Sequence, residues 1–218
     1  MKLKQTLLPV VVTLALSGIA NAALAVKYDF TGAAGDQVST AATMAVAGLT
    51  AADVFRGSGL TASAAVNSIS STGWSIGGLD LNDYYSFSVT PQAGWTMTLE
   101  SITFGERRSL TGIRDWEIRS SLDGFSAALG SGNVPDDTST RNQSVLLPGS
   151  FANLGSGVEF RIYGFTAEAA GGTWRLSSAS GGVGVEVYGS AVPEPHEYAM
   201  LAGLGLIGFA LWRRRTVK

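Results

Sequence analysis

The sequence predicts an all-β domain, an antiparallel β-sandwich or barrel, with a targeting segment at each end. Three observations lead to this expectation. The middle of the 218-residue chain contains several runs in which apolar and polar residues alternate, the period of a strand with one buried face. Clusters of Gly, Ser, Asn and Asp separate these runs and are typical of turns. Both ends of the chain carry apolar stretches without this alternation.

The N-terminal end is expected to be a secretory signal peptide. Lys2 and Lys4 precede an apolar run at residues 7–16, and small residues follow it. A basic region, an apolar core and an A-x-A cleavage site, in that order, characterise such a peptide. Two sites fit, with cleavage after Ala22 or after Ala25, and the sequence leaves this choice open.

The strands of the body are expected where the alternation is clearest. In one run Tyr85, Phe87 and Val89 alternate with Ser86 and Ser88. Similar runs occupy residues 95–104, 116–119, 158–163 and 183–188. No linker or fixed-period repeat divides this region, so a single sandwich or barrel is expected.

Two local features refine this prediction. The apolar parity of the run 95–104 changes at Glu100–Ser101, which predicts a β-bulge there. The tract 31–71, rich in Ala, Gly, Ser and Thr, predicts short strands and long loops, with a helical turn near Thr50 to Phe55.

The composition of the body excludes several kinds of partner and of chemistry. It carries nine Lys and Arg against fifteen Asp and Glu, a net charge of −6, which argues against nucleic acid or anionic lipid. The chain has no cysteine, and its single histidine, His196, lies in the tail. A Ser-His-Asp triad, a Cys-His pair and a His-based zinc site are therefore excluded from the body.

Carboxylates are the only catalytic groups left, and no pair of them stands out in the sequence. We therefore predict no catalytic residue, no cofactor and no metal site. Ca²⁺ binding is left open, because Asp80, Asn82 and Asp83 cluster, and Asp136 and Asp137 are adjacent, without the spacing of a dedicated site.

The tryptophans suggest a binding surface. Trp95, Trp116 and Trp174 have apolar neighbours of the same parity and are predicted to lie in the core. Trp74 has no such neighbours before it, and we predict a ligand platform there with Tyr84 beside it.

The C-terminal end resembles a membrane segment followed by a basic stop. Tyr198–Trp212 contains no charged residue, and as a helix of 15 residues it would reach about 22 Å. This is short for a bilayer core of about 30 Å, so the span needs snorkelling arginines or a thinner bilayer. Arg213, Arg214 and Arg215 are expected on the cytoplasmic side.

The tail also resembles a known family of sorting signals. The sequence VPEP at Val192–Pro195, the apolar stretch and the arginine cluster are similar, in content and order, to the PEP-CTERM signal of Gram-negative bacteria. The resemblance implies recognition of Pro193, Glu194 and Pro195 by an exosortase, a membrane-embedded peptidase. It also implies transient anchoring in the inner membrane and delivery to the cell surface or an exopolysaccharide matrix.

The body resembles a module found in exported proteins with this tail. The stretches DYYSFSVTPQAGWTMTLESITF, RDWEIRSSLDGF, FRIYGF and GTWRL carry the resemblance, which covers most of residues 73–176. It implies a jelly-roll-like β-sandwich and no particular activity. The chain departs from the module at residues 177–182, SSASGG, where related modules continue with an Asp-Asn-Val stretch.

Together these observations divide the chain into a signal peptide, a β-sandwich body and a sorting tail, at residues 1–25, 26–191 and 192–218. The function predicted is that of an exported, non-catalytic surface or matrix protein that an exosortase processes. The alternatives are a carbohydrate-binding module of the exopolysaccharide matrix and, ranked behind it, a carboxylate-based polysaccharide hydrolase. The ligand, the oligomeric state and the presence of an exosortase in the host are left open.

Overall fold

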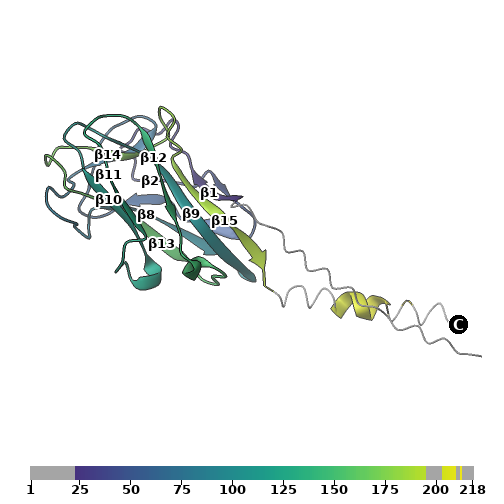
Figure 1. Ribbon diagram of the computed structural model, residues 1–218. Coiled ribbons are helices and arrows are strands. Elements are labelled where there is room, and N and C mark those ends of the chain that lie inside the picture. The colour runs from purple at the N-terminus through teal and green to yellow at the C-terminus, as the bar shows by residue number, and fades with distance from the viewer. Residues whose placement is uncertain (1–22, 195–202, 210–211, 213–218) are drawn as a thin grey trace, which may run out of the picture.

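The computed structural model describes residues 23–194, 203–209 and 212. Within them, two antiparallel β-sheets face each other across a common hydrophobic core (Figure 1). The predicted antiparallel β-sandwich is confirmed, and its jelly-roll-like connectivity stays a prediction. The expected signal peptide up to residue 22, Pro195 and the arginines at 213–215 lie outside the described residues.

The first sheet is organised around β9 (Trp95–Arg108), a strand of 14 residues. On one side β9 pairs first with β15 (Val185–Pro193) and then with β14 (Trp174–Ser177), and on its other side it pairs with β12 (Arg141–Leu146). The sheet continues through β1 (Ala23–Tyr28), β3 (Met44–Ala45), β7 (Ser68–Thr72) and β6 (Thr61–Ala62).

The second sheet has β10, β13 and β8 at its centre. Its order is β11 (Gly130–Asn133), β10 (Asp115–Ser120), β13 (Val158–Phe165), β8 (Tyr84–Pro91), β5 (Val54–Arg56) and β2 (Ser39–Thr40), with β4 (Leu49–Ala51) also on β8. Two short 3₁₀ turns, η1 (Ser121–Asp123) and η2 (Gly149–Phe151), complete the described elements.

The predicted bulge in β9 is confirmed. Leu99 pairs with Gly189 and Ser101 pairs with Tyr188, so that Glu100 is the extra residue between two neighbouring partners. The bulge lets both Leu99 and Ile102 point into the core although their parities differ. The long strand can therefore bury apolar side chains along its whole length.

The tryptophans are distributed between core and surface differently from the sequence prediction. Trp116 and Trp174 are buried as predicted, whereas Trp95, also predicted to lie in the core, is only half-buried. Trp74 is only 2% exposed, which corrects the expectation of a surface platform. Its indole packs edge-on against Tyr85 and Trp174, and its Nε1–H donates to the Ser71 carbonyl. The core accommodates this ring because its one polar group has an acceptor.

The region expected to hold a helical turn is extended instead. Thr50 and Phe55 lie in β4 and β5, which pair with β8. Arg56, at the end of β5, fixes the irregular chain beside it. Its guanidinium donates to the carbonyls of Gly35 and Ser70, among other acceptors. Long-range pairing and this one side chain, rather than local propensity, shape the segment.

The chain enters and leaves the body at the same end. β1 begins at Ala23, which pairs with Gly189, and the antiparallel β15 runs on to Pro193 (Figure 1). Pro193 still pairs with Trp95. Of the expected membrane segment, residues 203–209 are helical. No helix within the described part of the chain is long and apolar enough to cross a membrane.

Candidate functional site

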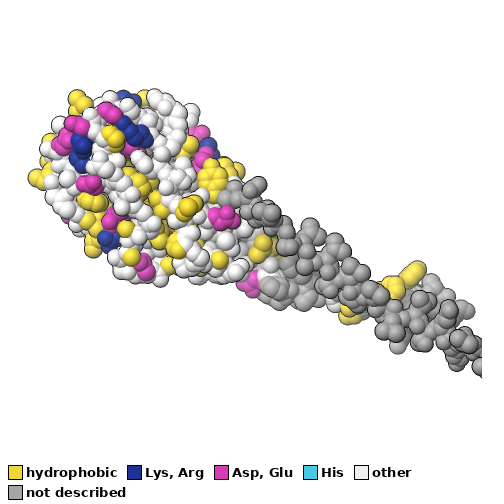
Figure 2. Space-filling view, viewed as in Figure 1, with side chains coloured by type: hydrophobic (Ala, Val, Ile, Leu, Met, Phe, Trp, Pro, Cys, Tyr) yellow, Lys and Arg dark blue, Asp and Glu magenta, His cyan; other side chains and the backbone are white. Residues whose placement is uncertain are grey.

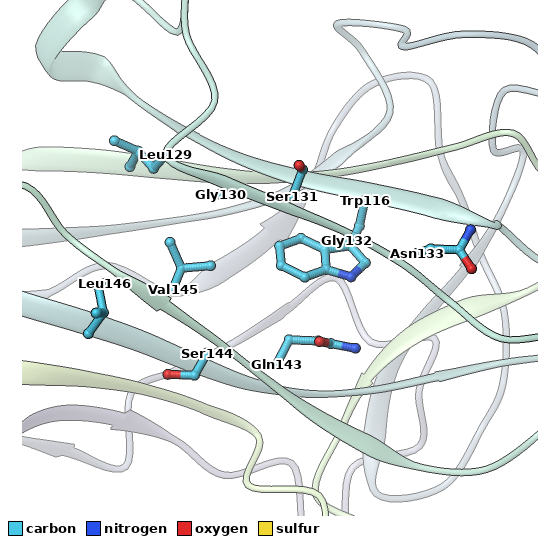
Figure 3. A pocket seen from close by; sticks show the side chains of 10 residues that line it. All are labelled: Trp116, Leu129, Gly130, Ser131, Gly132, Asn133, Gln143, Ser144, Val145 and Leu146. Atoms are coloured by element: carbon cyan, nitrogen blue, oxygen red, sulfur yellow. The ribbon is translucent and has the colours of Figure 1, made fainter.

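A cleft opens between the two sheets where both end in an edge strand. β11 forms the edge of the second sheet, and among the described strands β12 pairs only with β9, in the first sheet. The cleft between β11 and β12 has a volume of about 470 Å³, within the usual range of small-molecule sites. Trp116, which belongs to β10, lies at its floor (Figure 3). The close-up in Figure 3 shows all ten lining residues.

Two glycines of β11 keep this space open. A Cβ atom on Gly132 would lie 2.7 Å from the Trp116 ring, and one on Gly130 would lie 2.8 Å from Val145. The strand therefore lies closer to the indole and to β12 than any residue with a side chain would allow. Alternating glycines along one face of a strand are the sequence device that permits this approach.

The floor of the cleft carries a hydrogen-bond donor without a partner. The Trp116 ring is 3% exposed and packs edge-on against Phe104, with 5.0 Å between ring centroids. Its Nε1–H finds no acceptor among the described residues. A buried donor left unpaired costs about 1–3 kcal/mol. An acceptor supplied by water or by a ligand would remove that cost.

The amide of Gln143 faces the nitrogen edge of this indole. Gln143 projects from β12, and Figure 3 shows its amide on the side of the cleft to which the Trp116 nitrogen points. Its Nε2 donates to Glu106 Oε1 over 3.3 Å, and Trp174 Nε1 donates to Glu106 Oε2 over 3.0 Å. Because an ionised carboxylate only accepts hydrogen bonds, it orients the amide nitrogen inward and leaves the amide oxygen for the cleft.

Glu106 is itself an unusual core residue. It lies on the inner face of β9 and is fully buried. Burial raises the pKa of its carboxyl group, while hydrogen bonds from Trp174 and Gln143 and the charge of Arg141 oppose that change. Glu106 shares the parity of Ile102 and Phe104 beyond the predicted bulge, which places it on the inner face, but no sequence pattern showed that Trp174 and Gln143 would be its partners.

The lining of the cleft carries no charged side chain. Besides Trp116 and Gln143 it consists of small, apolar and neutral polar residues, which are Leu129, Gly130, Ser131, Gly132, Asn133, Ser144, Val145 and Leu146. Figure 2 shows that on the visible face the Lys and Arg side chains lie mostly at the end of the body away from the tail, whereas Asp and Glu side chains are spread along it. A neutral lining selects against charged ligands, because a charge would lose hydration without gaining a partner.

A second, smaller depression adjoins the cleft and shares Trp116, Ser131, Gly132 and Asn133 with it. Its volume is about 330 Å³, and Asp115, Glu117 and Phe165 complete its lining. The carboxylates already have partners, since Asn133 Nδ2 donates to Asp115 Oδ1 and Arg119 pairs with Glu117. This depression therefore has fewer free groups for a ligand than the cleft.

Tyr84 does not join Trp74 in a common platform. Its side chain lies on the outer face of the second sheet, whereas Trp74 is in the core. The Arg161 guanidinium covers the Tyr84 ring at 4.5 Å from the centroid and contacts the Phe125 ring at 3.8 Å. This stacking occupies the aromatic face that a sugar would need.

The acidic residues left open as Ca²⁺ ligands and the sorting triplet remain to be placed. Asp80 accepts hydrogen bonds from Asn82 within a turn, and the buried Asp83 accepts one from the Ser75 amide. Within residues 23–194, 203–209 and 212, no group of three or more His, Cys, Asp or Glu side chains could hold a metal ion. Of the sorting triplet, Pro193 and Glu194 are described, and the Glu194 amide donates to the Gly94 carbonyl.

No family model matches the chain, and no curated protein matches its sequence. Among solved structures, CBM29_1, a family 29 carbohydrate-binding module from Piromyces equi, is 12% identical with a TM-score of 0.40, covering 78% of this chain and 91% of that one. The K3 cleaved adhesin domain of Lys-gingipain from Porphyromonas gingivalis is 15% identical with a TM-score of 0.34, covering 56% and 72%. TmCBM61, in complex with β-1,4-galactotriose, is 9% identical with a TM-score of 0.32, covering 66% and 90%. Sequence identities and TM-scores this low say nothing about what this chain binds.

Proposed function

We propose that the protein is an exported, non-catalytic β-sandwich that binds a neutral carbohydrate in the cleft between β11 and β12. The observation that carries this proposal is the unpaired Trp116 Nε1–H at the floor of the cleft, beside the Gln143 amide. One group offers a donor and the other an acceptor. Because Nε1 is buried under β11, a ligand hydroxyl group reaches it only when β11 and the indole move apart; the hydroxyl then accepts one hydrogen bond and donates another.

The rest of the cleft suits the same class of ligand. Sugar rings present apolar C–H faces between their hydroxyl groups, and the half-buried Leu129 and the exposed Leu146, both in the lining, offer apolar surface to them. The absence of charge from the lining favours a neutral sugar over a uronic acid or an amino sugar.

We further propose that the tail delivers this body to the cell surface or to the exopolysaccharide matrix. The resemblance of Val192–Pro195 and the following residues to a sorting signal supports this part of the proposal. The triplet begins where β15 ends, at the exit of the chain from the body. Gln143 pairs with Phe104, about 30 Å along β9 from the residue that pairs with Pro193. A tether at this exit would therefore leave the cleft free.

Replacing Trp116 with phenylalanine tests the binding proposal. The variant keeps an aromatic floor but lacks the Nε1–H donor, so the affinity for a bound neutral oligosaccharide should fall by about 0.5–1.5 kcal/mol, roughly two- to tenfold. The lost donor itself costs no stability, because it has no acceptor among the described residues. The smaller ring leaves a cavity in the core and should cost about 1–3 kcal/mol, so folding of the variant is checked by circular dichroism before titration.

The measurement is calorimetric titration of the full chain in detergent with β-1,4-linked glucose, mannose and galactose hexamers and with the host's own exopolysaccharide. Trp95→Phe is the matched control, because Trp95 is half-buried on the first sheet and does not line the cleft. Flat titrations for the wild type with every probe, or equal losses in both variants, would refute a carbohydrate site in this cleft.

A further inference from the structure

Glu106 lies directly behind the cleft and connects it to the core. Its two carboxyl oxygens accept hydrogen bonds from different strands, one from Gln143 on β12 and one from Trp174 on β14. Both donors are neutral, and the carboxyl group is fully buried. Among the residues that line the cleft, Gln143 is the one whose side chain forms a hydrogen bond with Glu106.

We propose that Glu106 is a positioning residue whose protonation state decides which end of the Gln143 amide faces the cleft. This inference rests on the proposed function for its effect on binding, although the rearrangement itself does not need a ligand. When Glu106 is ionised, both of its oxygens can only accept, so Gln143 turns its Nε2 toward Glu106 and presents Oε1 to the ligand.

Protonation reverses this arrangement. The Trp174 Nε1–H continues to require Oε2 as its acceptor, so the proton resides on Oε1, the oxygen beside Gln143. An O–H at that position donates, and Gln143 must rotate its amide so that the amide oxygen accepts. The Gln143 NH₂ group then faces the cleft. The cleft then presents two donors, the Gln143 NH₂ group and the Trp116 Nε1–H. A single ligand hydroxyl group pairs less well with two donors than with one donor and one acceptor.

The surroundings of Glu106 set the pH at which this happens. Burial raises the pKa of Glu106, and Asp137, in the loop before β12, raises it further. Hydrogen bonds from Trp174 and Gln143 and the charge of Arg141, on β12, act in the opposite direction. Since the net direction is upward, Glu106 takes up its proton above the ordinary range of a glutamate, and the affinity should fall as the medium becomes mildly acidic.

Replacing Glu106 with glutamine imitates the protonated state at every pH. The new amide oxygen accepts from Trp174 Nε1–H while its nitrogen donates to Gln143, which holds Gln143 in the reversed orientation. Gln143→Met removes both ends of the amide and serves as the second variant. Titrations of the full chain with the hexamer that binds best, from about pH 8 to about pH 4.5, compare the three proteins.

We expect the wild-type affinity to fall about two- to tenfold across this range. Both variants should start at the weaker value and show no such change. A wild type without pH dependence, or an E106Q variant that keeps the wild-type affinity and profile, would overturn the inference. If E106Q does not fold, the comparison between the wild type and Gln143→Met decides in the same way.

A measurement without ligand separates this inference from the proposed function. In the wild-type protein the side-chain NH₂ signals of Gln143, assigned by their loss in Gln143→Met, should shift with pH as the amide reverses, and NMR detects this directly. If no hexamer binds but the signals shift, the proposed function fails and the positioning role of Glu106 stands. If the hexamer binds and the signals do not change with pH, the positioning role fails and the carbohydrate site stands.

Discussion

Replacing Gly132 with alanine tests the construction of the cleft from its wall. The added Cβ would lie 2.7 Å from Cζ2 of Trp116 and 2.9 Å from its Nε1. Carbon atoms pack best at about 3.5–4.0 Å, so either β11 must move outward by about 1 Å or the indole must move toward Phe104. Moving the indole would displace Phe104, which already packs edge-on against it. Moving β11 would disturb its pairing with β10.

The magnitude follows from two opposing contributions. Overpacking of a filled core costs about 1–3 kcal/mol, and replacing a strand glycine recovers about 0.5–1 kcal/mol through backbone entropy. At the midpoints of these ranges, the net loss in the free energy of unfolding is about 1 kcal/mol. For a domain of this size it corresponds to a decrease in Tm of about 2–4 °C.

Thermal and urea unfolding of the full chain, followed by circular dichroism, measure this loss. Gly149→Ala is the control, because a Cβ at that exposed position meets nothing within 4 Å; its stability should stay within about 0.5 kcal/mol of the wild type. If Gly132→Ala were as stable as the control, this would contradict the close contact of β11 with Trp116 and therefore the proposed geometry of the cleft.

Two further predictions concern the frame and the ends of the body. Replacing Arg56 with methionine should lower the free energy of unfolding in urea by about 2–3 kcal/mol, because the carbonyls of Gly35 and Ser70 lose a charged donor. Arg56→Lys should recover only part of this stability, since an ammonium group lacks the planar fork of a guanidinium. A methionine variant as stable as the wild type would contradict this role of Arg56. The intact mass of the mature protein from its host should begin at Ala23 and end near the Pro-Glu-Pro motif. Cleavage after Ala25 would remove half of β1 with a fully buried side chain, and a mass that runs through the last residue would contradict processing.

Much of the fold could be predicted because burial of one face imposes a local pattern. Strict alternation places Tyr85, Phe87 and Val89 on the inner face of β8, and the structure has all three buried. The parity change at Glu100 locates the bulge for the same reason. These inferences needed no knowledge of which strands pair, since a strand of 8 or 14 residues carries its own period.

Short strands and single aromatic residues were harder to predict. β4 and β5, of three residues each, are too short to show a period and exist through their pairing with β8. Trp74 looked exposed because no apolar residue of its parity precedes it, yet Tyr85 and Trp174 receive its ring in the core. Burial by residues distant in sequence cannot be inferred from neighbours along the chain.

The sequence by itself determined the class of fold, the faces of the long strands, the exclusion of histidine and cysteine chemistry from the body, and the expected targeting segments. Only the tertiary structure shows where the cleft proposed as the binding site lies. Its lining includes Trp116, Gly132 and Gln143, which three different strands contribute, and it forms where the edge strands β11 and β12 of the two sheets meet without pairing. Such a site depends on the relative placement of β10, β11 and β12, and no local pattern encodes that placement.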